Sequence, residues 1–143
     1  MSSLLVFPGQ GAQQPGMLQR LPRATLTEAS EVLGEDVALL DSADALRSTR
    51  AVQLCLLIAG VAASRQLLQD ELEADYVAGL SIGAYPAAVV AGALSFSDAL
   101  NLVSLRGELM QQAYPQGFGM TAIIGLQLST VETLLAQVHS AES

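Results

Sequence analysis

Hydrophobic positions in the first half of the chain alternate between a short run and longer helical patterns. The apolar run Leu4–Phe7 has the length of a buried strand, and the proline- and glycine-containing stretch after it predicts a loop. The helical patterns that follow predict a turn of helix around Met17–Leu21, a helix over Thr25–Leu33 capped by Thr25 and stopped by Gly34, and a long helix that begins at Ser48 or Thr49 and ends near Leu68. The pattern over Val37–Leu40 stays ambiguous.

The second half of the chain continues the alternation of strand and helix. The predicted elements are a strand over Tyr76–Ala78, a helix from Ile82 to about Gly92, a helix capped by Ser97 that runs to about Tyr114, a strand over Met120–Gly125 and an amphipathic helix over Thr130–His139. Asp98 falls in the first turn of the helix that Ser97 would cap, where the helix dipole favours a negative charge. The alternation favours an α/β fold with a largely parallel sheet.

The composition is apolar for a soluble chain of 143 residues. Hydrophobic residues make up 51% and charged residues 14%, and the mean hydropathy is +0.43. The length suits about one domain, so either the fold buries most of these side chains or a partner surface is missing. The longest apolar run, Leu54–Ala63, is shorter than the roughly 20 residues of a membrane span, which predicts a buried helix. No basic segment precedes the first apolar run, so we expect no signal peptide and a cytoplasmic location.

The charge and the cysteine content exclude several classes of function. A formal net charge of −8 and a pI near 4.3 argue against nucleic acid and anionic membranes as partners. The single cysteine, Cys55, lies within the apolar helix pattern. We therefore expect an inert core thiol with no disulfide and no metal site.

Ser81 carries the strongest chemical signal in the sequence. It stands in Gly79-x-Ser81-x-Gly83, between a predicted strand and a predicted helix, which is the pattern of a nucleophile elbow. In such a turn, side chains two residues before and after the serine would collide with neighbouring backbone, and glycine removes them. The turn also places the serine at a helix N-terminus, where unpaired N–H groups stabilise negative charge. The sequence therefore predicts an exposed, activated hydroxyl.

Two further features could act with Ser81. The glycine loop over Phe7–Gln13 leaves the first strand and fits an oxyanion-hole loop, because its spacing does not match the dinucleotide-binding pattern. Arg106 is the only arginine in the second half of the chain. It could pair with Glu108 or with solvent, or it could bind a carboxylate in two-point fashion, and its residue type alone leaves both open.

Taken together, three motifs resemble the malonyl-CoA:acyl carrier protein transacylase family in order and spacing. They are the loop Phe7–Gln13, the elbow around Ser81, and Arg106-Gly107-x-x-Met110-Gln111. The resemblance implies that Ser81 is the acyl nucleophile and that the backbone N–H groups of Gln10 and Ile82 form the oxyanion hole. It also implies that Arg106 holds the free malonyl carboxylate and that Gln53 lines the site. No metal or cofactor is implied, because malonyl-CoA is a substrate.

The resemblance also implies a domain organisation. Residues 1–119 would belong to an α/β-hydrolase-like subdomain with a parallel sheet, and residues 120–143 would begin a smaller ferredoxin-like subdomain. In that family the catalytic histidine lies further along the chain, beyond Ser143, whereas His139 here ends a polar-faced helix. The chain is therefore interpreted as an N-terminal half, inactive alone, whose partners are malonyl-CoA, an acyl carrier protein and the C-terminal half.

Two positions at the elbow separate this chain from most members of that family. Leu80 and Ala84 stand where histidine and glutamate are usual, and this version resembles the transacylase subunit of bacterial malonate decarboxylase. Two other interpretations stay open. One is a serine esterase or thioesterase that uses Ser81, Asp98 and His139, which follow the chain order of an α/β-hydrolase triad. The other is an inactive binding module that complements a second polypeptide.

Overall fold

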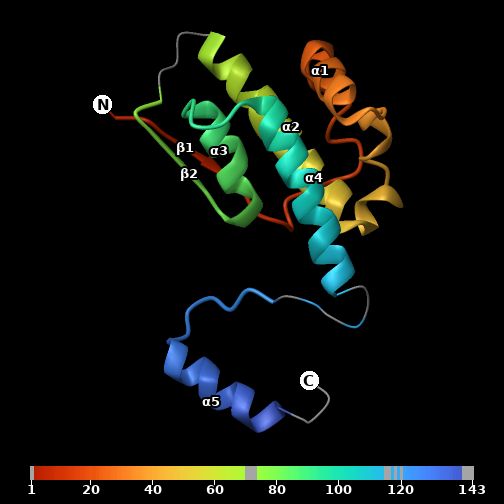
Figure 1. The fold of residues 1–143 in the computed structure, drawn as a ribbon. Helices are drawn as coiled ribbons and strands as arrows, with labels where there is room; N and C mark the ends of the chain where they lie inside the picture. Colours follow the sequence, from red (N-terminus) through yellow and green to blue (C-terminus); the bar gives the residue numbers. More distant parts are fainter. Residues whose placement is uncertain (1, 70–73, 115–116, 118, 120, 140–143) are drawn as a thin grey trace.

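Two parallel strands and the helices around them form the body of the molecule in the computed structural model (Figure 1). The structure describes residues 2–69, 74–114, 117, 119 and 121–139. The strands are β1 (Leu4–Phe7) and β2 (Tyr76–Gly79). The helices are α1 (Arg23–Leu33), α2 (Thr49–Gln69), α3 (Ala84–Val90), α4 (Phe96–Ala113) and α5 (Leu128–Val138), with the 3-10 helices η1 (Val37–Leu39), η2 (Ala45–Arg47) and η3 (Ser81–Gly83) between them.

The two strands lie side by side in a parallel register that runs from Leu4 opposite Tyr76 to Phe7 opposite Gly79. The predicted α/β class with a parallel sheet is confirmed for these strands. Because parallel strands end at the same edge of a sheet, the loop after Phe7 and the turn after Gly79 leave the sheet together. This arrangement brings the glycine loop beside the elbow.

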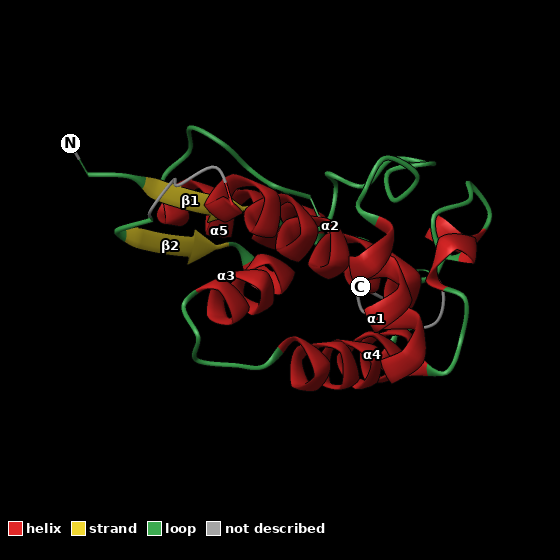
Figure 2. Cartoon of the chain, turned by 90° about the horizontal axis from the view of Figure 1, so that it is seen from above, coloured by secondary structure: helices red, strands yellow, loops and turns green. Residues whose placement is uncertain are grey.

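Helix α2 forms the centre of the core and packs against α1, α3 and α4 (Figure 2). Its segment Leu54–Ile58 is buried, and so is Cys55 within that segment. The stretch Thr49–Leu68 is long and apolar enough to cross a membrane by length and composition, and 61% of its most apolar window is buried inside the fold. The neighbouring helices thus account for its hydrophobicity, as expected of a buried helix.

Several helix boundaries differ from the sequence prediction for a local reason. The cap of α4 is Ser95 and not Ser97: the backbone N–H of Asp98 donates to Ser95 Oγ at 3.0 Å, which satisfies an amide of the first turn. Helix α1 begins at Arg23, directly after Pro22, so Thr25 lies inside the helix and is buried. The predicted stop at Gly34 is confirmed, since Gly34 adopts a left-handed φ of 69°.

Met17–Leu21 forms successive hydrogen-bonded turns, in which Gln19 N–H donates to Gly16 O at 3.2 Å and Leu21 N–H donates to Leu18 O at 3.1 Å, and the carboxylate of Asp41 accepts the Leu18 N–H at 2.9 Å. One predicted element, the strand over Met120–Gly125, is absent from the described residues. Met120 lies outside the described residues, and Thr121–Gly125 form no strand there. A strand needs a neighbour for its hydrogen bonds, whereas Ile124 in this segment is 92% exposed.

One face of the small sheet is uncovered. Leu4, Val6 and Tyr76 point to this face and are 56%, 66% and 65% exposed. The opposite face packs on α3, and Phe7 there is buried near Gly60 of α2 and Pro86 of α3. The apolar composition is therefore explained in part by the core and in part by surface that this chain leaves open.

Candidate active site

Ser81 occupies a strained turn between β2 and η3. Its φ of 53° is the only positive φ of a non-glycine residue among the described residues. Such a conformation destabilises the backbone by about 1–3 kcal/mol and persists only where the surroundings hold it. Two backbone hydrogen bonds do so: Leu80 N–H donates to Phe7 O at 3.1 Å, and Gly83 N–H donates to Leu80 O at 2.9 Å. The predicted strand-to-helix elbow is confirmed.

Both glycines of the motif are required by space. A Cβ at Gly79 would lie 2.0 Å from the carbonyl oxygen of Gly83, and a Cβ at Gly83 would lie 2.3 Å from the carbonyl oxygen of Phe7. Real Cβ atoms do not approach backbone so closely, so any side chain would open the turn. The spacing Gly-x-Ser-x-Gly is thus explained by contacts inside the elbow and with the end of β1.

The side chain of Arg106 on α4 reaches the serine. Its Nη2 donates to Ser81 Oγ at 3.1 Å, and its Nη1 donates to Gln53 Oε1 at 2.6 Å. The guanidinium carbon also lies 5.9 Å from the centre of the Tyr85 ring on α3. The alternative that Arg106 pairs with Glu108 is wrong, because the Glu108 carboxylate lies 3.1 Å from Arg50 Nε.

Gln53 connects Arg106 to the glycine loop. Its side chain is fully buried on α2, and its Nε2 lies 3.3 Å from Gln10 Oε1 and 3.3 Å from Met110 Sδ. The amide is therefore oriented with its oxygen toward Arg106 and its nitrogen toward Gln10. One chain of hydrogen bonds therefore connects α2, η3, α4 and the glycine loop. It joins four residues that the sequence proposed for the site: Gln10, Gln53, Arg106 and Ser81.

Ile82, the fifth residue singled out from sequence, follows the serine in η3 and has a fully buried side chain. Its amide is among the first of the helical turn, which have no partner within a helix. The glycine loop lies against the same turn, since a Cβ at Gly9 would be 3.1 Å from Leu80 O. Gly9, the neighbour of Gln10 in the glycine loop, therefore lies against the turn that leads into Ile82.

The electrostatics of this cluster favour an anion. Within the described ranges of the chain, no acidic side chain forms an ion pair with Arg106. Its positive charge stands beside a serine at the start of a helical segment, where the backbone also favours negative charge. A two-point donor such as a guanidinium is well suited to a carboxylate.

The structure does not bring Asp98 and His139 to the serine. Asp98 accepts a hydrogen bond from Ser95 Oγ at 2.6 Å at the start of α4, which confirms its expected first-turn position. His139 follows α5, its backbone N–H donates to Leu135 O at 2.8 Å, and its side chain is exposed. Helix α5 lies apart from α1–α4 (Figure 1). Within the described part of the chain, no interaction links Asp98 or His139 to Ser81.

Cys55 is also excluded as the reactive group. Burial raises the pKa of its thiol to about 12, and the negative charge of Asp41 adds to the effect. A thiol with this pKa is almost entirely protonated at neutral pH and is a poor nucleophile. The prediction of an inert core cysteine is confirmed.

Comparison with known sequences shows the family. A model of the acyl transferase domain matches residues 4–139. The chain belongs to the acyl transferase domain family. This acyl transferase domain is 42% identical over 150 residues to the malonyl CoA-acyl carrier protein transacylase of Haemophilus influenzae, an alignment that covers 96% of the chain and 48% of the relative. It is 42% identical over 137 residues to the enzyme of that name from Escherichia coli strain K12, covering 88% of the chain and 44% of the relative.

Solved structures match the fold of the acyl transferase domain as well. The malonyl CoA-acyl carrier protein transacylase of Coxiella burnetii superposes with a TM-score of 0.86 at 38% identity, over 96% of this chain and 47% of that one. A malonyl-transacylase solved in complex with its type II PKS acyl-carrier protein gives a TM-score of 0.82 at 39% identity, over 96% and 48%. The acyl transferase domain therefore spans about half the length of the relatives it matches.

Sequence reasoning missed the contacts of Met110 and Tyr85. Met110 stands in the third of the three motifs, which assigns it no role, and its Sδ lies 3.3 Å from Nε2 of the buried Gln53 amide. It lies four residues after Arg106 on the same helix, and this i, i+4 spacing was the available signal. Tyr85, whose ring lies near Arg106, carried no signal beyond its place after the elbow.

Proposed function

We propose that this chain carries the nucleophile and the carboxylate site of an enzyme that transfers malonyl groups from malonyl-CoA to the thiol of an acyl carrier protein. The observation that carries the proposal is the position of Arg106, hydrogen-bonded at once to Ser81 and to buried Gln53. A positive group held beside a nucleophilic serine suits an acyl group that ends in a free carboxylate. The names of the relatives point to the same substrate class.

In the proposed reaction Ser81 Oγ attacks the thioester carbonyl of malonyl-CoA and gives its proton to a general base. The negative oxygen of the tetrahedral intermediate accepts hydrogen bonds from the backbone N–H groups of Gln10 and Ile82. The C–S bond then breaks, coenzyme A leaves with the proton, and a malonyl ester remains on Ser81. The carrier thiol attacks that ester by the reverse route. Gln53 holds Arg106 in place on the malonyl carboxylate throughout.

We further propose that the general base comes from a second half of the enzyme. The chain spans about half the length of its relatives, and His139 lies on a helix apart from the site. The uncovered face of the sheet, with Val6 66% exposed, offers apolar surface for that second half. In this proposal residues 1–119 form an incomplete α/β-hydrolase-like subdomain, residues 120–143 begin the small subdomain, and the chain alone is inactive.

The elbow sequence suggests a more specific role. Leu80 is 72% exposed next to Ser81, and Ala84 follows the second glycine. In this respect the elbow resembles that of the transacylase subunit of malonate decarboxylase, whose acceptor is the carrier subunit of the same system. We propose this assignment, together with a cytoplasmic location, as the finer part of the function.

The test is acylation of Ser81 by malonyl-CoA. The chain is incubated with malonyl-CoA alone and after mixing with a polypeptide equivalent to the second half of a full-length relative, and intact mass and peptide mapping locate any adduct. We expect a malonyl adduct on Ser81 in the mixture and none in Ser81→Ala. An adduct on another residue, or one that persists in Ser81→Ala, would contradict the proposal.

The same samples separate the competing interpretations. A serine esterase would hydrolyse p-nitrophenyl esters with the chain alone and would lose that activity in His139→Ala. An inactive binding module would form no adduct on Ser81 in either sample. We expect neither result, because His139 is not within reach of Ser81 in the structure and Ser81 is exposed beside Arg106.

A further inference from the structure

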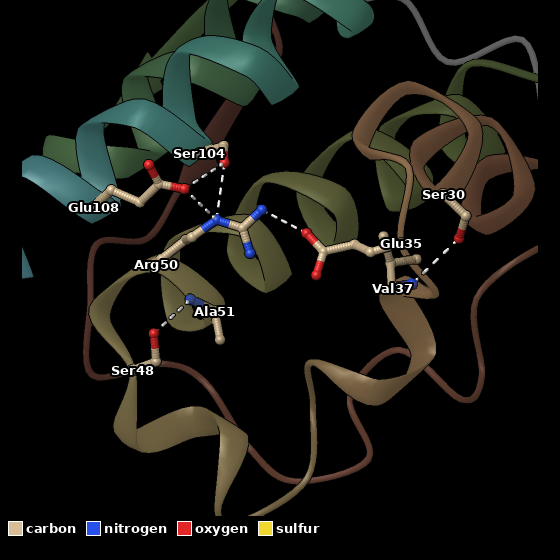
Figure 3. Close-up of polar contacts among 8 residues, drawn as sticks. All are labelled: Ser30, Glu35, Val37, Ser48, Arg50, Ala51, Ser104 and Glu108. Carbon is tan, nitrogen blue, oxygen red and sulfur yellow. Dashed lines mark hydrogen bonds and ion pairs between the residues drawn. The ribbon is translucent and has the colours of Figure 1, made fainter.

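A second polar cluster joins α2 to α4 one helical turn from the site (Figure 3). Its centre is Arg50, whose Nη2 donates to Glu35 Oε1 at 2.5 Å and whose Nε lies 2.8 Å from Ser104 Oγ and 3.1 Å from Glu108 Oε1. The Arg50 side chain is only 22% exposed, against 48% for Glu108. One guanidinium thus holds α4, α2 and the loop after α1 together.

The spacing of residues places this cluster in register with the site. On α2, Arg50 and Gln53 are three residues apart, so they face the same side of the helix. On α4, Ser104 and Glu108 contact Arg50, whereas Arg106 and Met110 contact Gln53. A further contact lies at the start of α2, where Ser48 Oγ donates to Gln111 Oε1 of α4 at 2.9 Å. The contacts of Arg50 and those of Gln53 are adjacent, and only the contacts of Gln53 belong to the candidate site.

Gly107 brings the two helices into direct backbone contact between these sets. A Cβ at Gly107 would lie 2.5 Å from Arg50 Cα, so the helices cross at this point with no side chain between them. Arg106 is the next residue on α4. Any rotation or sliding of α4 against α2 at this crossing would move the Arg106 guanidinium relative to Ser81.

Arg50 is badly placed for the stability of its own helix. It is the second residue of α2, and a positive charge in the first turn opposes the helix dipole. Its charge is instead matched by carboxylates from outside α2, Glu35 and Glu108. Its role is therefore to be sought in the contact between elements.

We propose that Arg50 is a positioning residue: its bonds to Glu35, Ser104 and Glu108 fix the rotation of α4 on α2 that aims Arg106 at Ser81. The position of the Arg106 guanidinium can be measured without any assumption about catalysis. The effect of that position on acyl selectivity rests on the proposed function, so position and selectivity are tested by separate measurements.

The first measurement needs no catalysis. The chain has six arginines and no lysine, so NMR of protein labelled with 15N-arginine gives a simple side-chain spectrum. The signal that is lost in Arg106→Lys is assigned to Arg106. We expect Glu108→Gln and Ser104→Ala to shift the Arg106 signal. The matched control is Glu28→Gln, which breaks the ion pair between Glu28 of α1 and Arg65 of α2. It should leave the Arg106 signal unchanged.

An Arg106 signal that does not move in Glu108→Gln or Ser104→Ala would overturn the proposal. Both substitutions are mild, and a circular dichroism spectrum equal to that of the unaltered chain shows that the fold is retained. A shift of equal size in Glu28→Gln would also overturn it, because it would show a general response of the fold.

The second measurement uses the complete enzyme and compares kcat/KM for malonyl-CoA and acetyl-CoA. We expect Arg50→Met to lower the preference for malonyl about tenfold, through misplacement of a charge-assisted hydrogen bond, with Arg50→Lys between it and the unaltered enzyme. In an Arg106→Ala background Arg50→Met should change the preference no further. Arg65→Met is the matched control and should leave the preference unchanged.

If Arg50 has a purely structural role, Arg50→Met would lower kcat/KM for both substrates by the same factor, and its effect would add to that of Arg106→Ala. Either result would overturn the proposal. If the complete enzyme transfers no malonyl group at all, the proposed function fails, while the NMR shifts still decide whether Arg50 positions Arg106.

Discussion

At the scale of single residues, the site depends on how few groups hold Arg106. Its two terminal nitrogens donate to Gln53 and Ser81, and the ring of Tyr85 lies nearby. Gln53 is fully buried, so its amide cannot turn to water if Arg106 is removed. Arg106 therefore both satisfies a buried acceptor and presents a positive charge beside the serine.

Replacing Arg106 should alter substrate choice more than turnover. In the complete enzyme we expect Arg106→Ala to lose about 10- to 100-fold in kcat/KM for malonyl-CoA, the effect of one charge-assisted pair of roughly 1.5–3 kcal/mol. Acetyl-CoA, which offers no carboxylate, should be transferred as well as before or better. Steady-state kinetics with both thioesters measures the ratio. Arg106→Lys keeps the charge without the two-point geometry and should fall between. An unchanged ratio in Arg106→Ala would remove this residue from the site.

At the scale of elements, the elbow works as one unit made of β2, η3 and α3 against the end of β1. The backbone of Ser81 is held by contacts of Gly79 with Gly83 and of Gly83 with Phe7. Since the strained φ of Ser81 is maintained only by this packing, the position of its hydroxyl depends on both glycines. Strand pairing between β1 and β2 is thus a condition for the site.

A methyl group at Gly79 should therefore break the elbow. We expect Gly79→Ala to destabilise the chain by about 3 kcal/mol or more, because its Cβ would meet backbone that cannot move aside, at the upper end of overpacking effects. The measurement is chemical denaturation followed by circular dichroism. Gly119→Ala is the matched control, since a Cβ there meets no atom within 4 Å, and it should change stability by less than about 0.5 kcal/mol. Equal stability of the two variants would show that the elbow is looser than described.

At the scale of the whole molecule, apolar surface remains open at several places among the described residues, and two of them bear on the proposed second half. One face of the β1–β2 sheet carries Leu4, Val6 and Tyr76, and α5 carries Leu128 and Val138 at 73% and 75% exposure. Exposed apolar patches mark interaction sites in soluble proteins. With the coverage of about half of each relative, this surface supports the proposal that a second polypeptide segment completes the structure.

The exposed sheet face gives a test of that proposal. We expect Val6→Thr to change the unfolding free energy of the chain by less than about 0.5 kcal/mol, because this side chain is 66% exposed and threonine suits a strand. Val103→Thr, at a fully buried position of α4, is the matched comparison and should cost about 1–3 kcal/mol. Denaturant titration measures both. In the mixture with a second half, Val6→Thr should weaken association. If Val6→Thr destabilises the chain alone as much as Val103→Thr, the face is already covered in solution.

The features predicted correctly from sequence are those fixed by neighbours in the chain. The strand Leu4–Phe7, the long helix from Thr49, the stop at Gly34 and the elbow around Ser81 follow from periodicity, from turn chemistry and from two glycines at a fixed spacing. One error lies where two local choices were nearly equal. Ser95 and Ser97 are both acceptable caps, and the capping bond to Asp98 selected Ser95. The stretch Thr121–Gly125 has the composition of a strand but no neighbouring strand in the described residues.

The sequence by itself determined that a serine stands on a strained turn at the start of a helix, because glycine two residues before it and two residues after it is the signature of that turn. Only the tertiary structure decided what faces that serine. Arg106 is 53 residues from Gln53 and 25 from Ser81, and its choice of these partners over nearby Glu108 follows from the packing of α4 on α2. Hydrogen bonds between distant residues depend on the crossing of whole helices, and no local pattern encodes that crossing.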